Sequence, residues 1–312
     1  MNDLVFPPLS PSPLAEGDSV AITAPASPVS PALLHKAVRS LEFLGLKPVV
    51  MASCKMSHGY LSGEDEARAA DINDVFAAKE IKGIFCLRGG YGCMRLLPFL
   101  DYQSIRQNPK VFIGYSDITA LHTAINKLSG LITFHGPMPS IDYTSLDRFT
   151  LTSLKTMLFC RKKALDIKNP LDQRITTLFP GSASGMLTGG NLALLASTLG
   201  SPYEVNTKGR ILFMEDVNEP PYRLDRAFTA LSLAGKFEDC CGIILGTFKG
   251  CCQSDSGGLS IYDIVREVIL KYRKPTVINL RAGHVYPQLT LPMGEQISLT
   301  AHEKTEPNIS VL

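Results

Sequence analysis

A serine at the junction of an apolar run and a helical pattern is the residue best placed for chemistry. Residues 111–113 are Val, Phe and Ile, Gly114 follows, and apolar residues at helical spacing begin two positions after Ser116. This pattern predicts a sharp turn from a strand into a helix, with Ser116 in the turn. Nucleophilic serines occupy such turns, because the hydroxyl is exposed and the N–H groups of the helix start stabilise negative charge. The common motif G-x-S-x-G is only half met, since Ile118 stands at the second glycine, so an ordinary helix N-cap at Ser116 or Asp117 is the alternative.

An activated serine needs a histidine base, an acid that orients the base, and donors for the oxyanion. Two of the six histidines fit the role of base: His135 follows an apolar run, and His284 lies in a loop rich in glycine and proline. His122 is expected to be a packing residue, because six helical positions from Ser116 place it on another face. The residues alone leave the choice between His135 and His284 open, with an idle surface histidine as the alternative for His284.

The acid and the oxyanion donors have candidates of their own. Glu215 ends an apolar run and Asp216 follows; since neighbours on a strand point to opposite faces, we expect that only one of them can face a given site. A solvated strand end is the alternative.

The loop RGGYG (88–92) lacks the spacing of a dinucleotide or phosphate loop, but its glycines let backbone N–H groups approach a reacting oxygen. The N–H groups of Gly90 and Asp117 are therefore candidates for an oxyanion hole, with an ordinary glycine turn as the alternative.

Alternating strands and helices must position these residues. Buried strands are predicted at 19–24, 47–52, 81–87, 111–114 and 131–134, and helices at 31–45 and 64–79. The alternation predicts an α/β fold whose N-terminal parallel sheet has helices on both faces. Ligands bind beyond the carboxyl ends of the strands in such sheets, where Ser116, the 88–92 loop and His135 are all expected.

The length of 312 residues indicates two domains, because it exceeds the comfortable size of one core. We expect an N-terminal α/β domain at 1–165 that carries the nucleophile. A polar, proline-containing linker is expected at 166–184, and a C-terminal mixed α/β domain at 185–312. The glycines of LTGGN (187–191) are expected to form a structural turn before a helix.

Composition excludes several classes of protein. Hydrophobic residues make up 45% of the chain and charged residues 19%, as in ordinary soluble globular proteins, and a net charge of +2 without a basic run argues against nucleic-acid binding. No apolar run reaches the roughly 18 residues of a membrane helix, and the proline-rich start lacks the basic region of a signal peptide. We therefore expect a cytoplasmic protein without membrane contact.

The eight cysteines are expected to be reduced thiols in that compartment. Four of them form the adjacent pairs Cys240–Cys241 and Cys251–Cys252, which raises the question of zinc. Adjacent residues point apart and rarely reach one ion together. We expect these cysteines to pack at strand ends, and we expect no metal and no cofactor.

Seven segments, in order from about residue 18 to 300, resemble the LD-carboxypeptidase family of serine peptidases, which includes muropeptide LD-carboxypeptidases and microcin self-immunity peptidases. The segments are VAITAPASP, CLRGGYG, GYSDITALH, FHGPM, LTGGNLALLASTLGSPY, LFMEDVNEPPYRLDR and AGHVYP. The resemblance implies a catalytic triad of Ser116, Glu215 and His284, with the backbone N–H groups of Gly90 and Asp117 as the oxyanion hole. It also implies an N-terminal α/β domain, a C-terminal domain of mixed strands, an active site between them, and a homodimer.

The resemblance further implies a reaction. The substrate is expected to be a cytoplasmic murein tetrapeptide from cell-wall recycling, from which the enzyme removes the terminal D-Ala bound to the L-centre of the diamino acid. Arg88, Tyr91 and Arg223 lie in the matching segments and are candidates for substrate binding, although surface ion pairs would account for the two arginines equally well.

Two other functions are the alternatives. A self-immunity peptidase would hydrolyse peptidyl-adenylate toxins; members of that branch stack tryptophan on the adenine, and this chain has no tryptophan, although tyrosine could substitute. A non-catalytic small-molecule binding protein on the same scaffold would leave Ser116 as an inert cap.

Overall fold

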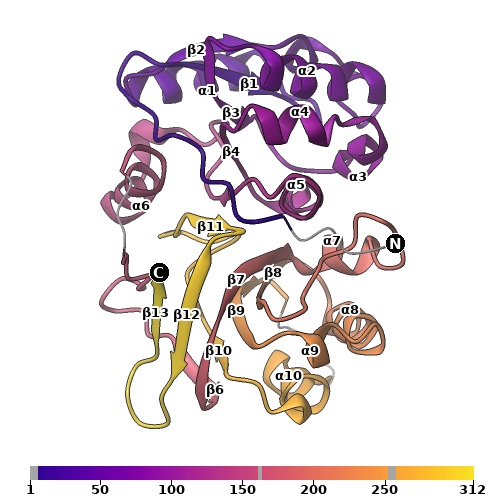
Figure 1. The fold of residues 1–312 in the computed structure, drawn as a ribbon, viewed down its shortest axis with the longest axis vertical. Coiled ribbons are helices and arrows are strands. Elements are labelled where there is room, and N and C mark those ends of the chain that lie inside the picture. Colours follow the sequence, from indigo (N-terminus) through magenta and orange to yellow (C-terminus); the bar gives the residue numbers. More distant parts are fainter. Residues whose placement is uncertain (1–5, 161–163, 252–257) are drawn as a thin grey trace. The chain divides into compact units, whose positions relative to one another are not determined.

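The computed structural model describes residues 6–160, 164–251 and 258–312, which form two compact units (Figure 1). The first unit comprises the described residues of Met1–Arg161 and Thr290–Gly294. The second unit comprises the described residues of Lys162–Leu289 and Glu295–Leu312. The chain therefore passes between the units three times, after residue 161, before residue 290 and after residue 294. Within the described ranges, no helix has the length and apolar character needed to span a membrane.

The first unit is built on a six-stranded sheet in the order β11-β5-β4-β3-β1-β2. Its strands are β1 (Ser19–Thr23), β2 (Lys47–Val50), β3 (Ile81–Cys86), β4 (Val111–Gly114), β5 (Thr133–His135) and β11 (Leu291–Met293). β1 to β5 pair in parallel, which confirms the predicted parallel sheet. β11 adds an antiparallel edge strand beside β5, from a part of the chain where we expected none.

Helices cover both faces of this sheet, because successive strand residues point to opposite sides. Val111 and Ile113 of β4 belong to a buried cluster that includes side chains of α1 and α6. Phe112, between them, points the other way and stacks on Phe76 of α2, with ring centroids 6.4 Å apart. His122 of α5 lies edge-on to the same Phe112 ring. The helices of this unit are α1 (Pro31–Phe43), α2 (Asp65–Ala77), α3 (Cys93–Leu96), α4 (Tyr102–Gln107), α5 (Thr119–Ser129) and α6 (Arg148–Phe159).

The second unit contains a seven-stranded sheet in the order β13-β12-β7-β8-β9-β10-β6. Its strands are β6 (Thr176–Phe179), β7 (Gly181–Asn191), β8 (Ile211–Val217), β9 (Gly242–Lys249), β10 (Thr276–Ile278), β12 (Gln296–Ala301) and β13 (Asn308–Val311). β7 to β10 pair in parallel, and β6, β12 and β13 are antiparallel to their neighbours, so the sheet is mixed. The segment 166–184, expected as a linker, holds β6 and the first residues of β7.

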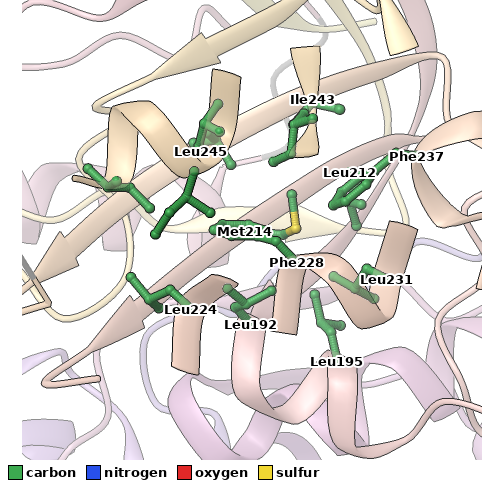
Figure 2. Packing of buried hydrophobic residues seen from close by; sticks show 14 of the residues in the cluster. Leu192, Leu195, Leu212, Met214, Leu224, Phe228, Leu231, Phe237, Ile243 and Leu245 are labelled. Carbon is green, nitrogen blue, oxygen red and sulfur yellow. The ribbon is translucent and has the colours of Figure 1, made fainter. Parts of the chain in front are cut away.

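A hydrophobic core joins this sheet to its helices (Figure 2). Leu212 and Met214 of β8 point into the core, together with Ile243 and Leu245 of β9, and Phe228 packs against them from α8. Each fully buried side chain of this size stabilises the fold by about 1.5–3 kcal/mol. The helices are α7 (Leu192–Ser197), α8 (Pro221–Leu233), α9 (Lys236–Asp239) and α10 (Ile261–Val268).

The paired cysteines take part in this packing. Cys240 and Cys251 belong to the buried cluster, and Cys241 Sγ lies 3.6 Å from the carbonyl oxygen of Ser184. Cys252 lies outside the described residues. Among the residues that the structure describes, no group of three or more His, Cys, Asp or Glu side chains is placed to hold a metal ion.

Candidate active site

Ser116 sits in a strained turn directly after β4. It begins the short 3-10 helix η3 (Ser116–Ile118), and its backbone φ of 65° lies in the left-handed region. Such a conformation costs a non-glycine residue about 1–3 kcal/mol and is concentrated at functional sites. Gly114 permits the turn, because a Cβ there would lie 2.8 Å from the Ile118 side chain. Neither Ser116 nor Asp117 caps α5, since Ile118 occupies the N-cap position and makes no side-chain hydrogen bond.

The RGGYG loop (88–92) packs against Ser116. A Cβ added to Gly89 would lie 3.1 Å from Ser116 Oγ and 3.5 Å from the backbone nitrogen of Asp117. Glycine is therefore what lets the loop approach the serine so closely. The structure brings together Ser116, Asp117 and this loop, and the role of the Gly90 and Asp117 N–H groups as an oxyanion hole stays a prediction.

Two residues that the sequence analysis missed hold the loop in place. Ser27 lies against Gly90, whose φ is 123° and where any Cβ would collide with Ser27 Oγ. Ser27 Oγ also accepts a hydrogen bond from the Tyr91 N–H at 3.3 Å. Arg68 of α2 is fully buried and donates to the carbonyl oxygen of Gly92 at 3.2 Å. Ser27 stands in the matching segment VAITAPASP, which was its available signal. Arg68, in a polar helical segment, carries no local signal because its role depends on tertiary contacts.

The Asp117 side chain is structural. Its carboxylate accepts a hydrogen bond from the Cys93 N–H at the start of α3, at 2.9 Å. Burial raises the pKa of this carboxyl. The role predicted for Asp117 uses its backbone N–H, which this side-chain contact leaves unaltered.

In the second unit, the structure brings together Glu215 and His284. Glu215 is fully buried in β8, and His284 lies in the loop after β10 with its side chain 19% exposed. The distance between His284 Nδ1 and Glu215 Oε2 is 2.8 Å, and the His284 backbone N–H donates to the same oxygen at 3.3 Å. A carboxylate that accepts from Nδ1–H fixes the ring orientation and stabilises the imidazolium.

The backbone of Gly283 and the side chain of Asn191 pack closely around the Glu215 carboxylate. Gly283 has a φ of 98°, and a Cβ there would collide with the Glu215 carboxylate. Asn191 Nδ2 donates to Glu215 Oε1 at 3.4 Å and to Asp216 Oδ1 at 3.0 Å. The side-chain amide of Asn191 thus contacts the carboxylates of both neighbouring residues. The register between β8 and β9 shifts at this point of the sheet. Glu215 pairs with His284, whereas the Asp216 carboxylate accepts from Asn191, Ala193 and Val217.

Asn191 is a further site residue that the sequence analysis missed. LTGGN (187–191) is the end of strand β7 rather than a free turn, and Asn191 Oδ1 caps α7 by accepting from the Leu194 N–H at 3.3 Å. An asparagine directly after two glycines and before a helix was the available signal. Asp216 is anchored in the same way, accepting from the Ala193 N–H at 3.0 Å, and burial raises its pKa to about 6.

Two histidines of the first unit, His122 and His135, are core residues. His122 is fully buried; its Nε2 donates to the Gly114 carbonyl at 2.9 Å, and its Nδ1 accepts from Thr133 Oγ1 at 2.8 Å. Burial lowers the pKa of His122 to about 4, and its predicted packing role is confirmed. His135 is also fully buried, with its ring centroid 5.9 Å from that of Tyr115. Partial exposure and a carboxylate partner favour His284 as the base.

The three substrate-binding candidates lie in different settings. Arg88 is half-buried and donates to a carbonyl of the loop after β1 at 3.4 Å. Tyr91 is 47% exposed and lies edge-on to the Tyr60 ring, with centroids 5.6 Å apart. Arg223 is exposed in the first turn of α8 and forms an ion pair with Glu219 at 3.5 Å, which is the surface pairing named as its alternative.

Comparison with known proteins shows the family to which this chain belongs. The family profile described as the LD-carboxypeptidase N-terminal domain matches residues 20–136, and the profile of the LD-carboxypeptidase C-terminal domain matches residues 184–299. The chain belongs to the LD-carboxypeptidase family, as the seven sequence segments predicted.

Individual relatives span almost the whole chain. A probable murein peptide carboxypeptidase of Bacillus subtilis (strain 168) is 40% identical over 296 residues, covering 95% of this chain and 92% of the relative. The microcin C7 self-immunity protein MccF of Escherichia coli is 30% identical over 335 residues, covering 97% and 96%.

Solved structures show the same fold. Wild-type MccF without ligand matches with a TM-score of 0.88 at 28% identity, covering 97% of this chain and 98% of that one. A muramoyltetrapeptide carboxypeptidase from Oxalobacter formigenes matches with a TM-score of 0.84 at 28% identity, covering 94% and 98%. The expected fold class is confirmed, and the fold is common to both branches of the family.

Proposed function

We propose that this protein is a serine LD-carboxypeptidase that releases the terminal D-Ala from murein tetrapeptides in cell-wall recycling. The bond cleaved joins the L-centre of the diamino acid to D-Ala. The observation that carries the proposal is the Glu215–His284 pair, an acid–base unit with a 2.8 Å contact. It occurs in a chain 40% identical to a probable murein peptide carboxypeptidase.

In the proposed mechanism, Ser116 Oγ attacks the carbonyl carbon of the diamino acid while His284 takes the serine proton. Because Glu215 engages Nδ1, Nε2 is the nitrogen that serves as the base, and the buried carboxylate balances the charge of the imidazolium. The N–H groups of Gly90 and Asp117 stabilise the oxyanion. His284 then protonates the departing amine of D-Ala, and a water molecule activated by His284 hydrolyses the acyl-enzyme.

The test is mass spectrometry of L-Ala-D-Glu-meso-diaminopimelate-D-Ala after incubation with wild type and Ser116→Ala. We expect wild type alone to remove one alanine, since Ser116→Ala should lower kcat by a factor on the order of 10⁶ and loss of the Glu215 carboxylate by about 10⁴. Ser182→Ala, at an exposed serine in β7, is the matched control. A loss of less than tenfold in Ser116→Ala would remove Ser116 from the role of nucleophile.

A peptidyl-adenylate is the second candidate substrate, because MccF is 30% identical and one MccF structure holds aspartyl sulfamoyl adenosine. The absence of tryptophan from this chain ranks it below murein peptides. Turnover of an aminoacyl-sulfamoyl-adenosine, without turnover of the tetrapeptide, would reverse the order. Failure of a fluorophosphonate to label Ser116 would instead favour a non-catalytic binding protein.

The remaining parts of the proposal concern assembly and compartment. We infer a homodimer that acts on free murein peptides in the cytoplasm, supported by the resemblance to the family. Light scattering that gives twice the chain mass would agree with the dimer, and a mass of one chain at micromolar concentration would contradict it.

A further inference from the structure

A pocket of about 580 Å³ opens on the first unit. It is lined by the loop after β1, by the start of α1, and by η1 (Ala52–Lys55) with the residues that follow it. The volume lies within the range of roughly 300–1,000 Å³ that is typical of small-molecule sites. None of the residues placed so far in the proposed mechanism lines this pocket.

The pocket lies at the carboxyl edge of the parallel sheet, the same edge that carries Ser116. The residues that line the pocket come directly after β1 and β2 in the chain. Gly90 comes after β3 and Ser116 after β4, and these strands lie in the order β4-β3-β1-β2. Two strand spacings, about 10 Å, separate β4 from β1, and a third, about 5 Å more, leads to β2, after which Lys55 lies, so the long lysine side chain must cover that remaining distance. Three extended residues also span about 10 Å, and three residues remain on the acyl side when D-Ala leaves a tetrapeptide.

Direct contacts join the pocket wall to the RGGYG loop. Arg88 Nη1 donates to the carbonyl oxygen of Pro28, a lining residue, at 3.4 Å. The neighbouring Ser27 accepts from the Tyr91 N–H at 3.3 Å. A peptide that extends from Ser116 past this loop would therefore reach the pocket along one connected surface of the first unit.

The residues that line the pocket are suited to bind a ligand in which a negatively charged group lies next to a small apolar group. Lys55 and His35 are exposed basic side chains, and the lining contains no aspartate or glutamate. Val29, Leu34 and Met56 supply apolar wall. The acyl portion of a murein tetrapeptide offers the matching groups, because the α-carboxylate of D-Glu lies next to the methyl group of L-Ala.

We propose that this pocket binds the L-Ala-D-Glu end of the substrate, with Lys55 Nζ paired to the α-carboxylate of D-Glu. The assignment rests on the proposed function and adds to it the group that sets substrate preference. Lys55 is a binding residue in this assignment, remote from the bond that breaks, so it acts on KM and leaves the chemical step to the triad.

The test compares two tetrapeptides that differ in one group, the free α-carboxylate of D-Glu or its amide in D-isoglutamine. For wild type we expect a kcat/KM about tenfold higher for the acid, the size of one charge-assisted hydrogen bond at a solvated site. In Lys55→Met the ratio of the two kcat/KM values should fall to about one, mainly through a higher KM for the acid. Lys47→Met is the matched control, since Lys47 is equally exposed but begins β2 at the amino edge of the sheet.

The outcomes distinguish a failure of the pocket assignment from a failure of the proposed function. A ratio near one in wild type, or a ratio that Lys55→Met leaves unchanged, would overturn the assignment while D-Ala release upholds the proposed function. Failure of wild type to release D-Ala from either peptide would overturn the proposed function, and with it the pocket assignment. A ratio lost in Lys47→Met as well would show that overall charge, rather than the pocket, sets the preference.

Discussion

Gly283 shows how closely the backbone is fitted around Glu215 and His284. Its left-handed conformation places the chain so that His284 reaches the carboxylate with both its backbone N–H and its ring. Any side chain at this position would occupy the space of the Glu215 carboxylate. The acid–base pair therefore depends on a residue that itself carries no chemistry.

Gly283→Ala should displace Glu215, His284 or both, and lower kcat by about 100-fold, the usual cost of misplacing a catalytic group by about 1 Å. The measurement is kcat for D-Ala release. Gly209→Ala is the matched control, since Gly209 also has a positive φ, of 64°, but has no atom within 4 Å of an added Cβ. Equal kcat values for the two variants would show that the fit around Glu215 is not needed.

At the scale of elements, α5 is joined to the sheet by a buried histidine. His122 links the helix to the end of β4 through the Gly114 carbonyl and to β5 through Thr133. Both contacts use the neutral ring, with the proton on Nε2. Burial holds its pKa at about 4 instead of the ordinary 6.5. Protonation of the ring would end the acceptor role of Nδ1 toward Thr133, whereas Nε2–H can donate to Gly114 in either state.

The sign of the resulting pH dependence follows from proton uptake. Between pH 6.5 and about 4 the unfolded chain protonates His122 and the folded chain does not, so stability present above pH 6.5 is lost as the pH falls to about 4. The whole loss amounts to about 3 kcal/mol. We expect the difference in free energy of unfolding between wild type and His122→Asn to shrink over this range in urea titrations. A difference that stays constant over this range would show that the burial of His122 does not set the pH dependence.

At the scale of the whole molecule, β11 connects distant parts of the sequence. It pairs with β5, and the Met293 carbonyl oxygen accepts from Asn126 Nδ2 at 3.2 Å. The C-terminal part of the chain thus completes the sheet of the first unit. A fragment that ends at residue 160 has every other strand of that sheet but leaves the β5 edge unpaired, and unpaired edges promote aggregation.

We expect the fragment 1–160 to be poorly soluble when expressed alone and to be recovered in soluble form with the fragment 164–312, which carries β11. The measurement is the soluble yield of the first fragment and its co-purification through a tag on the second. A second fragment with Leu291→Lys and Met293→Lys, both buried in the intact chain, is the control and should fail to rescue. A soluble, monomeric 1–160 fragment would show that β11 is dispensable.

How much the sequence predicts depends on whether a signal is local. The parallel strands β1 to β5 and the turn at Ser116 were predicted, because apolar runs and the spacing around GYSD are local patterns. β11 was not, since its three residues, Leu-Pro-Met, resemble a loop and its partner lies more than 150 positions away. The approach of Glu215 to His284, 69 residues apart, was expected from family resemblance alone. Asn191 was missed because its role depends on a register shift between two other strands.

The left-handed backbone at Ser116 also limits how this position can change. A side chain branched at Cβ is a steric outlier at such a φ, so threonine, which carries the same hydroxyl group, does not fit the turn without strain. Cysteine is unbranched at Cβ and fits it as serine does. The backbone therefore disfavours β-branched residues at this position, and among the side chains that could serve as a hydroxyl or thiol nucleophile it leaves serine and cysteine.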